Sequence, residues 1–587
     1  MTVLVPGPRA GLRRAPDAEP WLFGGALAVI AVLALLPSLR LLGEALGGRG
    51  IGTADGALDG LLGSNIGHHF ATVLSQPVTW RATLNSLTVS AAGTAIALAL
   101  GSLFAILVGL TDLRRRRAMM FLFVLPLVIA PQVVALAWLQ LLGPSSALLK
   151  SIGLAPPPGA PNPLYGAGGI ALLLGIQYAP LVCLTLRAGL RGLPRELPEA
   201  ARASGAGPAR TLVTVTLPLM TPALVAGTAL TYVSCLGNFG VPAFLGIPAG
   251  YPVLPTLIYQ RLAGLGPSVL PEVAVLGVLI GTLAVAGVML QEHMLRRRDF
   301  RVQAGAGSET LFPLGRWRGA VECAVWTFLA VTVALPMLAL AMTSLLPALG
   351  AAFERGTLTL EHYRFVLFEH AATRRAFANS LLLSGAAAAL ILALSVPLAQ
   401  ALHLGHGRLA RAARLLVELP YALPGIVLAL AAILLFIKPL PLLNWSPYNT
   451  LWIIFFCYLA RFLVLGLRPV AGARQQMDPA LEEAARVAGA GTATRLATIV
   501  WPSVAPMAVA GALMVFLTAF NELTVSALLW SSGNETLGVA LFGFQTGGEA
   551  TLAAALATTT TVVTIGLMLG MQWLGRALPS GVIPWRD

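Results

Sequence analysis

The chain has 587 residues, of which 57% are hydrophobic and 11% are charged. Soluble proteins carry roughly 25% charged residues, so a soluble, disordered or collagen-like protein is excluded. A net charge of +14 would indicate nucleic-acid binding in a soluble protein, but in a membrane protein it is typical of Arg-rich cytoplasmic loops. We therefore predict an all-α integral membrane protein with no nucleic-acid partner.

Apolar runs long enough to cross a bilayer recur along the whole chain. The first, from Trp21 to about Leu39, follows a short Arg-rich tail like a signal peptide. It lacks a clean small-residue cleavage site, so we expect an uncleaved first span. The further spans are expected at 83–110, 118–142, 167–186, 216–237, 272–291, 320–345, 378–402, 415–437, 449–467, 501–520 and 552–575. About 12 transmembrane helices are therefore predicted, in two homologous six-helix halves.

Basic residues divide unevenly between the two sides that these spans define. If both termini are cytoplasmic, 27 of the 38 Lys and Arg residues lie on the cytoplasmic side, 10 lie on the other side, and Arg461 falls within a span. Cytoplasmic loops of membrane proteins are enriched in Lys and Arg. We therefore predict that both termini are cytoplasmic.

Three segments occur twice, in the same order. "WRATLNSLTVS" (80–90) matches "RRAFANSLLLS" (374–384), and "LPLVIAP" (125–131) matches "LPYALP" (419–424). "EAARASGAGPARTLVTVTLP" (199–218) matches "EAARVAGAGTATRLATIVWP" (483–502). Six spans per half give both copies one orientation, which is typical of a parallel repeat with a pathway between the halves. We predict a first domain at 1–291, a cytoplasmic linker at 292–319 and a second domain at 320–587.

The third repeated segment lies in a predicted cytoplasmic loop of each half. We call these the EAA loops, at 195–218 and 479–502. Pro198 or Pro479 can open a short helix, and Glu near its start complements the helix dipole. The small Ala residues leave a smooth face for close approach, and the Gly can turn the chain where φ is positive. This pattern indicates a docking element built from Glu199, Ala200, Ala201 and Gly205 in the first copy and Glu483, Ala484, Ala485 and Gly489 in the second.

These segments resemble the EAA signature in membrane subunits of bacterial binding-protein-dependent ABC importers. The resemblance covers nearly the whole chain as two fused permease domains, and is greatest to the ferric iron permeases. Neighbouring branches carry thiamine, polyamines, sulfate or phosphonates. Membership implies an inner-membrane protein whose EAA loops dock on two cytoplasmic ATP-binding subunits and which receives substrate from a periplasmic solute-binding protein. Trp501 stands where Leu is usual.

The chain itself has no ATP-binding motif. A P-loop needs a lysine between Gly and Ser or Thr. The two lysines of the sequence are Lys150, which follows Leu149, and Lys438, which precedes Pro439. We therefore expect no catalytic site and no cofactor in this chain, with ATP and Mg²⁺ used by the partner ATPase.

Candidate pathway residues follow the EAA loops. Asn238 in the first half corresponds to Glu522 in the second, with Asn521 beside it. A carboxylate at the outer end of a span is costly and is by default a functional hypothesis, here for a cation such as ferric iron. The alternative is that Glu522 only holds neighbouring helices together. Gln132, Gln260 and Gln545 are weaker candidates.

No metal site is predicted. The four cysteines form no CxxC motif. Glu361, His362, Glu369 and His370 could share a helix face, but we interpret them as the solvated face of an interfacial helix. The main alternative function is an ion-coupled secondary carrier, since "GLTDLRRRR" (109–117) faintly resembles a loop motif of such carriers, although it lacks the Gly after the basic residue. Nothing in the sequence supports a membrane-embedded enzyme.

Overall fold

The computed structural model describes residues 19–46, 68–191, 194, 196–264, 269–296, 312–354, 356–439 and 444–574. Throughout these ranges the regular structure is helical, apart from one isolated bridge between Thr111 and Phe312. The Arg-rich N-terminal tail, most of the linker (297–311), Arg195 and the C-terminal residues 575–587 lie outside the described residues. The orientation of the termini stays a prediction.

The membrane-spanning helices divide evenly between the halves. Ten described helices are long and apolar enough to cross a bilayer, and two bent pairs bring the total to as many as 12. The first half contributes Glu19–Ala45, Pro77–Leu110, Pro131–Ser151, Ala167–Arg191, the pair Pro208–Leu219 with Thr221–Leu236, and Val269–Gln291. The second half contributes Gly315–Ser344, Ala371–Leu404, the pair Gly407–Ala422 with Gly425–Phe436, Leu451–Gln476, Thr492–Phe520 and Ala550–Trp573. The predicted fold class is confirmed.

Three predicted spans are not continuous helices. The span predicted at 118–142 is broken between α6 (Arg116–Val128) and α7 (Pro131–Leu142). The span at 415–437 is bent by 105° between α21 (Gly407–Ala422) and α22 (Gly425–Phe436). In both breaks the residue before a proline is extended, with ψ of 138° at Ala130 and 137° at Leu423, because the proline ring disfavours the helical conformation there. The span at 216–237 is bent by 66° at Met220, between Pro218 and Pro222.

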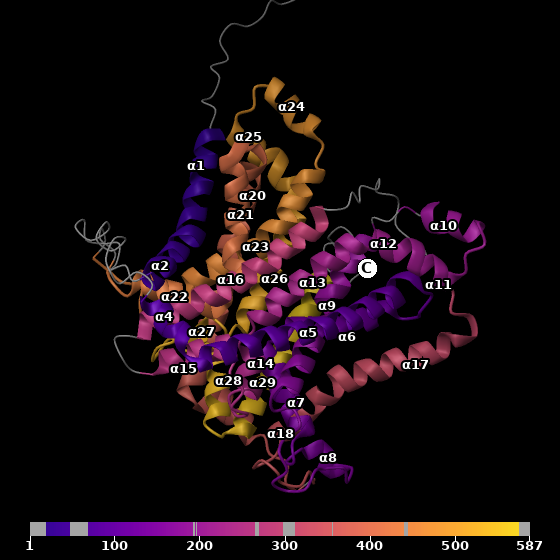
Figure 1. Ribbon diagram of the computed structural model, residues 1–587, viewed down its shortest axis with the longest axis vertical. Coiled ribbons are helices and arrows are strands. Elements are labelled where there is room, and N and C mark those ends of the chain that lie inside the picture. Colours follow the sequence, from indigo (N-terminus) through magenta and orange to yellow (C-terminus); the bar gives the residue numbers. More distant parts are fainter. Residues whose placement is uncertain are drawn as a thin grey trace, which may run out of the picture.

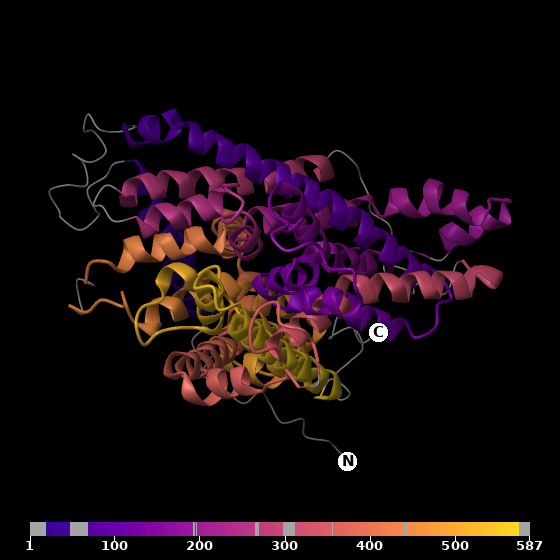
Figure 2. The same cartoon turned by 90° about the horizontal axis from the view of Figure 1, so that it is seen from below.

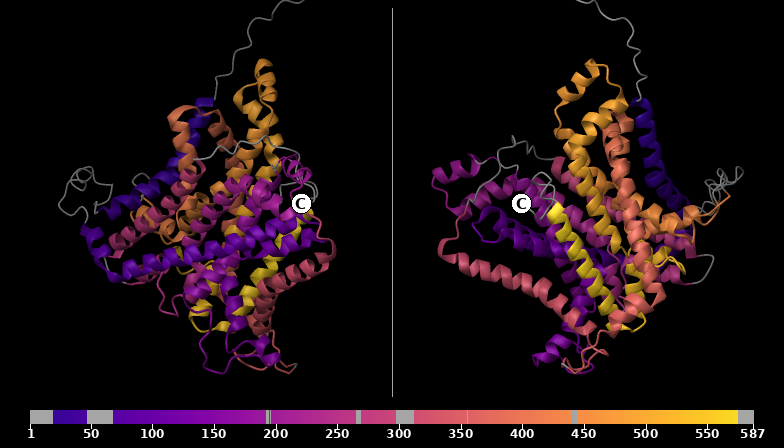
Figure 3. Two further views of the ribbon diagram at one scale, coloured as in Figure 1. Left: turned by 45° about the vertical axis from the view of Figure 1, so that its right-hand side comes forward. Right: turned by 180° about the vertical axis from the view of Figure 1, so that it is seen from behind.

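The first span of each half lies on the other half. In the first half, α1 (Glu19–Ile30) packs on α20 (Ala371–Leu404), and α2 (Leu36–Ala45) packs on α22. Conversely, α17 (Arg318–Leu329) packs on α6, and α18 (Leu335–Ser344) packs on α7. Figures 1 and 3 show this exchange, with the indigo α1 beside the orange helices of the second half. One apolar core therefore runs through both halves.

A serine of the first repeated segment caps the start of a short helix in each half. The Ser86 hydroxyl accepts the amide of Leu254, the first residue of α15 (Leu254–Ala263), at 2.8 Å. The Ser380 hydroxyl accepts the amide of Leu537, the first residue of α28 (Leu537–Thr546), at 2.9 Å. Free amides at a helix start need such acceptors. The repeated Ser therefore links the second span of each half to the segment before its sixth span.

Candidate functional site

Each EAA loop folds as a short helix followed by a sharp turn. The helices are α10 (Glu196–Ala203) and α24 (Pro479–Val487), where Asp478 caps α24 by accepting the Ala480 amide at 2.9 Å. Gly205 and Gly489 follow with φ of +85° and +84°. This left-handed conformation is open to glycine because it has no Cβ. The predicted positive φ is therefore confirmed at both positions.

The candidate residues of the two loops match in their exposure to solvent. Beyond the candidate glycines there is open space, since a Cβ built at either would meet no atom within 4 Å. Figure 1 shows α24 at the top of the molecule and α10 at its right-hand edge, on separate arms, and Figure 2 shows the arm with α10 as magenta helices at the right-hand edge of the view. The exposed candidates are Glu199, Ala200, Gly205, Glu483, Ala484 and Gly489, while Ala201 and Ala485 are half-buried.

The proline that ends each repeated segment shapes the return into the membrane. π-helical turns at Leu212–Thr216 and Leu496–Val500 precede Pro218 and Pro502. Proline has no amide hydrogen for the carbonyl four residues earlier, so the hydrogen-bond ladder shifts by one residue. Both loops therefore re-enter through a π-helical turn, and only the first-half span is then bent, at Met220.

The second EAA loop is held by a buried polar cluster that sequence reasoning missed. Arg474 Nε donates to Gln400 Oε1 at 2.6 Å, and Gln400 Nε2 donates to Glu482 Oε1 at 2.7 Å. Arg474 also pairs directly with Glu482. Arg495 lies 3.8 Å from Glu482 and pairs at 2.7 Å with Glu19 of α1. We call Gln400, Arg474, Glu482, Arg495 and Glu19 the anchor cluster; it ties the loop to α20, α23 (Leu451–Gln476) and the first half.

The first EAA loop carries other residues at three positions of the anchor cluster. The offset of 284 residues between the loops places Leu190, Pro198 and Thr211 at the positions of Arg474, Glu482 and Arg495. All three are buried. The buried charges of the second loop are therefore replaced at these three positions by uncharged side chains in the first. Glu482, the acidic residue directly before the repeated motif, was the sequence signal for this difference.

Asn238 and Glu522 each cap a short helix. Asn238 is 5% exposed; its Oδ1 accepts the Val241 amide at 3.0 Å in α14 (Gly240–Leu245), and its Nδ2 donates to Tyr178 Oη at 2.9 Å. Glu522 is 8% exposed, and its carboxylate accepts the amides of Val525 (2.8 Å) and Ser526 (3.2 Å) at the start of α27 (Ser526–Leu529). Glu522 has no ion pair within the described chain. Equivalent positions therefore carry equivalent local structure.

The third pathway candidate, Asn521, contacts the other half. Its side chain donates to Thr564 Oγ1 at 3.0 Å in α29 (Ala550–Leu574), and its main-chain carbonyl accepts Gln132 Nε2 at 2.9 Å. Gln132, one of the weaker candidates, is thereby placed between the halves. Gln260 is exposed on α15 and Gln545 is half-buried on α28.

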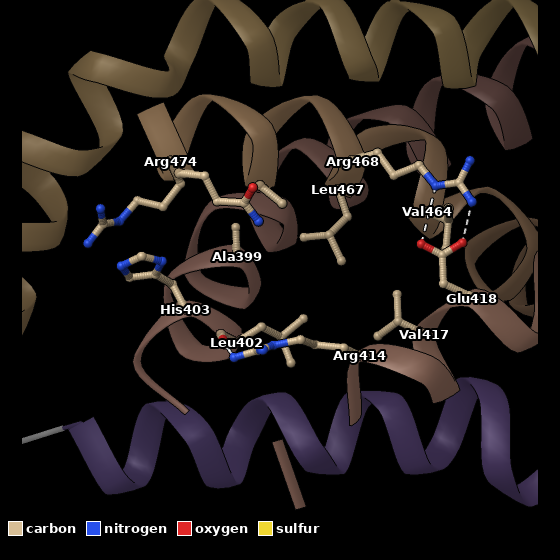
Figure 4. Close-up of a pocket in the computed structure, with 12 residues that line it drawn as sticks. Ala399, Leu402, His403, Arg414, Val417, Glu418, Val464, Leu467, Arg468 and Arg474 are labelled. Carbon is tan, nitrogen blue, oxygen red and sulfur yellow. Dashed lines mark hydrogen bonds and ion pairs between the residues drawn. The ribbon is translucent and has the colours of Figure 1, made fainter. Parts of the chain in front are cut away.

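A cavity of about 250 Å³ lies between α20, α21 and α23. Figure 4 shows Arg468 turned to Glu418, with Arg414 and His403 at the opposite wall. The Arg414 guanidinium donates to the Leu402 carbonyl, and Arg474 belongs to the anchor cluster. The arginines of this cavity are therefore already engaged by neighbouring groups.

His362 and His370 lie close to a main-chain carbonyl and a hydroxyl group. Within the described chain no three His, Cys, Asp or Glu side chains are grouped to hold a metal ion. His362 Nε2 lies 2.8 Å from the Leu346 carbonyl, and His370 Nδ1 lies 2.7 Å from Thr373 Oγ1.

Known proteins share both halves of this arrangement. The model of the family "Binding-protein-dependent transport system inner membrane component" matches residues 97–299 and 385–582. The chain is 28% identical over 469 residues to the "Probable ABC transporter permease protein y4fN" of Sinorhizobium fredii, covering 79% of this chain and 81% of that protein. It is 28% identical over 230 residues to the "Molybdenum transport system permease protein ModB" of Escherichia coli, covering 38% and 96%. It is 23% identical over 466 residues to the "Ferric transport system permease protein FbpB" of Actinobacillus pleuropneumoniae, covering 77% and 65%.

The two matched segments coincide with the two copies of the repeat, since each contains one EAA loop and the spans around it. Together they make up more than half of the chain. The chain therefore belongs to the family of inner membrane components of binding-protein-dependent transport systems, as a fused two-domain ABC transporter permease.

Proposed function

We propose that this chain forms the complete translocation pathway of an ATP-driven importer and docks two separate ATP-binding subunits on its two EAA loops. The observation that carries this proposal is the pair of loops with one geometry, exposed on separate arms of one chain. Each presents a Glu, small Ala residues and a left-handed Gly on an otherwise open surface. A surface with so little side-chain bulk allows close approach of a partner.

The remaining partners follow from the same proposal. A periplasmic solute-binding protein delivers substrate to the side opposite the EAA loops, and the chain lies in the bacterial inner membrane with both termini in the cytoplasm. The chain uses no cofactor, since ATP and Mg²⁺ are bound by the ATPase subunits. A chain that carries both permease halves needs no second copy of itself.

Relatives supply two candidate substrates of opposite charge. Ferric iron is supported by the resemblance of the whole fused chain and by a ferric relative that matches both halves. A molybdenum oxyanion is supported by a relative that matches one half at slightly higher identity. Both assignments fit one pathway between the halves, because the family carries substrates of different charge on one architecture.

The proposal is tested by reconstitution. The chain is purified with its neighbouring ATP-binding subunit and solute-binding protein, and placed in proteoliposomes. We expect uptake to need all three components and ATP, and we expect the chain alone to hydrolyse no ATP. Uptake that persists without the ATPase would instead establish an ion-coupled carrier.

A further inference from the structure

Arg461 is a charged side chain in the middle of a membrane span. It lies halfway along α23, within the span Leu451–Gln476. Its Nη1 is buried and has no hydrogen-bond partner among the described residues, and no carboxylate of that part of the chain pairs with the guanidinium. An ionisable group at this depth is expensive unless it meets a partner, and such residues mark substrate pathways. The guanidinium therefore needs a partner that the described residues do not supply.

The absence of a side chain at Gly425 leaves space for Arg461. A Cβ built on Gly425 would lie 1.8 Å from Arg461 Nη1 and 2.7 Å from its Cζ. The guanidinium thus rests against the main chain of α22 at the helix break, where any other residue would displace it. In the first half Pro131 stands at the equivalent of Gly425 in the repeated break. The glycine and the arginine therefore occur together, in one half.

The first half uses the equivalent side chain for structure. The offset of 284 residues that relates the EAA loops places Gln177 at the position of Arg461. Gln177 Nε2 donates to the carbonyls of Pro126 and Ile129, at the break between α6 and α7. A neutral amide is thus enough to complete such a break. The positive charge of Arg461 is an addition that the architecture does not require.

The surroundings of Arg461 lie where the two halves meet. The methyl carbon Cγ2 of Thr524 lies 3.0 Å from the same Cβ position on Gly425, so Thr524 packs against this site. Pro424 Cα lies 3.3 Å from a Cβ built on Gly237 of the first half, which precedes Asn238. Tyr178 accepts from Asn238, so its own hydroxyl hydrogen is free to donate, and it lies within electrostatic range of Arg461.

The acidic group within range of Arg461 is engaged at a helix start. Glu522 is within electrostatic range of Arg461, but its carboxylate oxygens accept two amides and the Ser526 hydroxyl at the start of α27. Within the described chain Glu522 makes no hydrogen bond or ion pair with Arg461. Arg461 Nη1 is therefore a donor without an acceptor among the described residues.

We propose that Arg461, with Tyr178, forms a subsite for a small oxyanion in the translocation pathway. The subsite rests on the proposed importer function and names its substrate class. A guanidinium presents a planar fork of donors that matches oxyanion geometry, and the Tyr178 hydroxyl adds a further donor. At low local dielectric the same charge repels a bare cation, so the subsite disfavours ferric iron. Arg468, two turns along α23, continues the polar face, with its guanidinium 5.7 Å from the Tyr421 ring.

The experiment uses the assembled importer in proteoliposomes with labelled molybdate, sulfate, phosphate and ferric iron. We expect uptake of an oxyanion and a decrease of at least about tenfold in Arg461→Gln, which installs the side chain that the first half carries. Arg461→Lys should recover part of the uptake, since it keeps the charge but loses the fork. The matched control is Arg364→Gln, which removes an exposed arginine at the outer surface. Assembly and thermal stability in detergent are measured for each variant.

The outcomes separate the subsite from the importer function. Oxyanion uptake that falls in Arg461→Gln while assembly and stability persist supports the subsite. Ferric iron as the transported probe, or oxyanion uptake unchanged in Arg461→Gln, overturns it and leaves the importer intact. Failure of the chain to assemble with an ATPase overturns the proposed function itself, whatever the fate of Arg461.

Discussion

The side chain of Gln132 in the first half donates a hydrogen bond to the main-chain carbonyl of Asn521 in the second half, at 2.9 Å. A related contact joins the other pair of segments, where Pro424 Cα lies 3.3 Å from a Cβ built on Gly237. Gly237 and Asn521 are 284 residues apart, and each directly precedes a capping residue of its half. In each half, the segment that follows the fifth span thus contacts the helix break of the other half. These two contacts join the halves where the pathway is proposed to pass.

Replacing Gln132 with Met should weaken the junction of the halves. Met keeps the volume but removes the donor, which leaves the buried Asn521 carbonyl unsatisfied at a cost of about 1–3 kcal/mol. We expect a lower melting midpoint in detergent and reduced transport. The control Gln475→Met changes an exposed glutamine at the end of α23. Equal midpoints for the two variants would contradict a role for the Gln132–Asn521 contact.

The double variant Gly205→Val, Gly489→Val should uncouple the EAA loops without preventing insertion. Both glycines are left-handed, and a β-branched residue there costs on the order of 1–2 kcal/mol or more. We expect loss of ATPase binding, measured by co-purification, with the chain still in the membrane. Gly207→Ala is the matched control, because Gly207 has φ of −68° and open space around it. Full transport by the double variant would contradict the docking turn.

The repeat carried most of what the sequence could predict. The apolar runs predicted the number of spans, and the shared offset predicted that Gly205 and Gly489 turn alike. The helix breaks were missed, although Pro131 and Pro424 stood in the repeated segments, because hydropathy averages over a break of two residues. The exchange of first spans could not be predicted, since apolar faces pack equally well on either half.

Charged residues showed the limits of sequence reasoning most clearly. Glu522 was a pathway candidate because a carboxylate at the end of a span is costly. The structure adds that this carboxylate accepts the amides of Val525 and Ser526. Arg461 was counted as a residue within a span, but its role depends on Gly425, which is distant in sequence. A contact between spans that far apart has no local sequence pattern.

Asp112→Asn should destabilise the contact between the loop at Asp112 and the segment that leads into α17. Asp112 Oδ1 accepts the Leu314 amide at 2.9 Å and Oδ2 lies 3.4 Å from Arg318. The Leu314 amide, assisted by Arg318, lowers the pKa of Asp112 below its ordinary value of 3.8. Since the folded pKa is the lower one, the ionised carboxylate stabilises the fold above pH 3.8, and this stabilisation is lost as the pH falls through the folded pKa.

The melting midpoint of Asp112→Asn should therefore be lower than that of the unmodified chain at pH 7, and the difference should vanish in strong acid. Glu549→Gln, at an exposed carboxylate, is the control for a change of charge alone. A difference that is independent of pH would show that the ionised form of Asp112 is not what holds the Leu314 segment.

Glu482→Gln should destabilise the second EAA loop and leave the first in place. Glu482 is 9% exposed, and its partners Arg474 and Arg495 are each 3% exposed. Removing one member of a buried ion pair leaves uncompensated charge, at a cost of about 3–5 kcal/mol.

The first EAA loop should be unaffected by Glu482→Gln because Pro198 stands at the equivalent position. We expect weaker binding of one ATPase subunit, so that the purified complex contains one subunit where the unmodified chain is proposed to bind two, measured by native mass spectrometry. The control is Glu369→Gln, whose pair with Arg364 is exposed and contributes about 0–1 kcal/mol. Two bound subunits in Glu482→Gln, with stability equal to that of Glu369→Gln, would show that the anchor cluster does not position the loop.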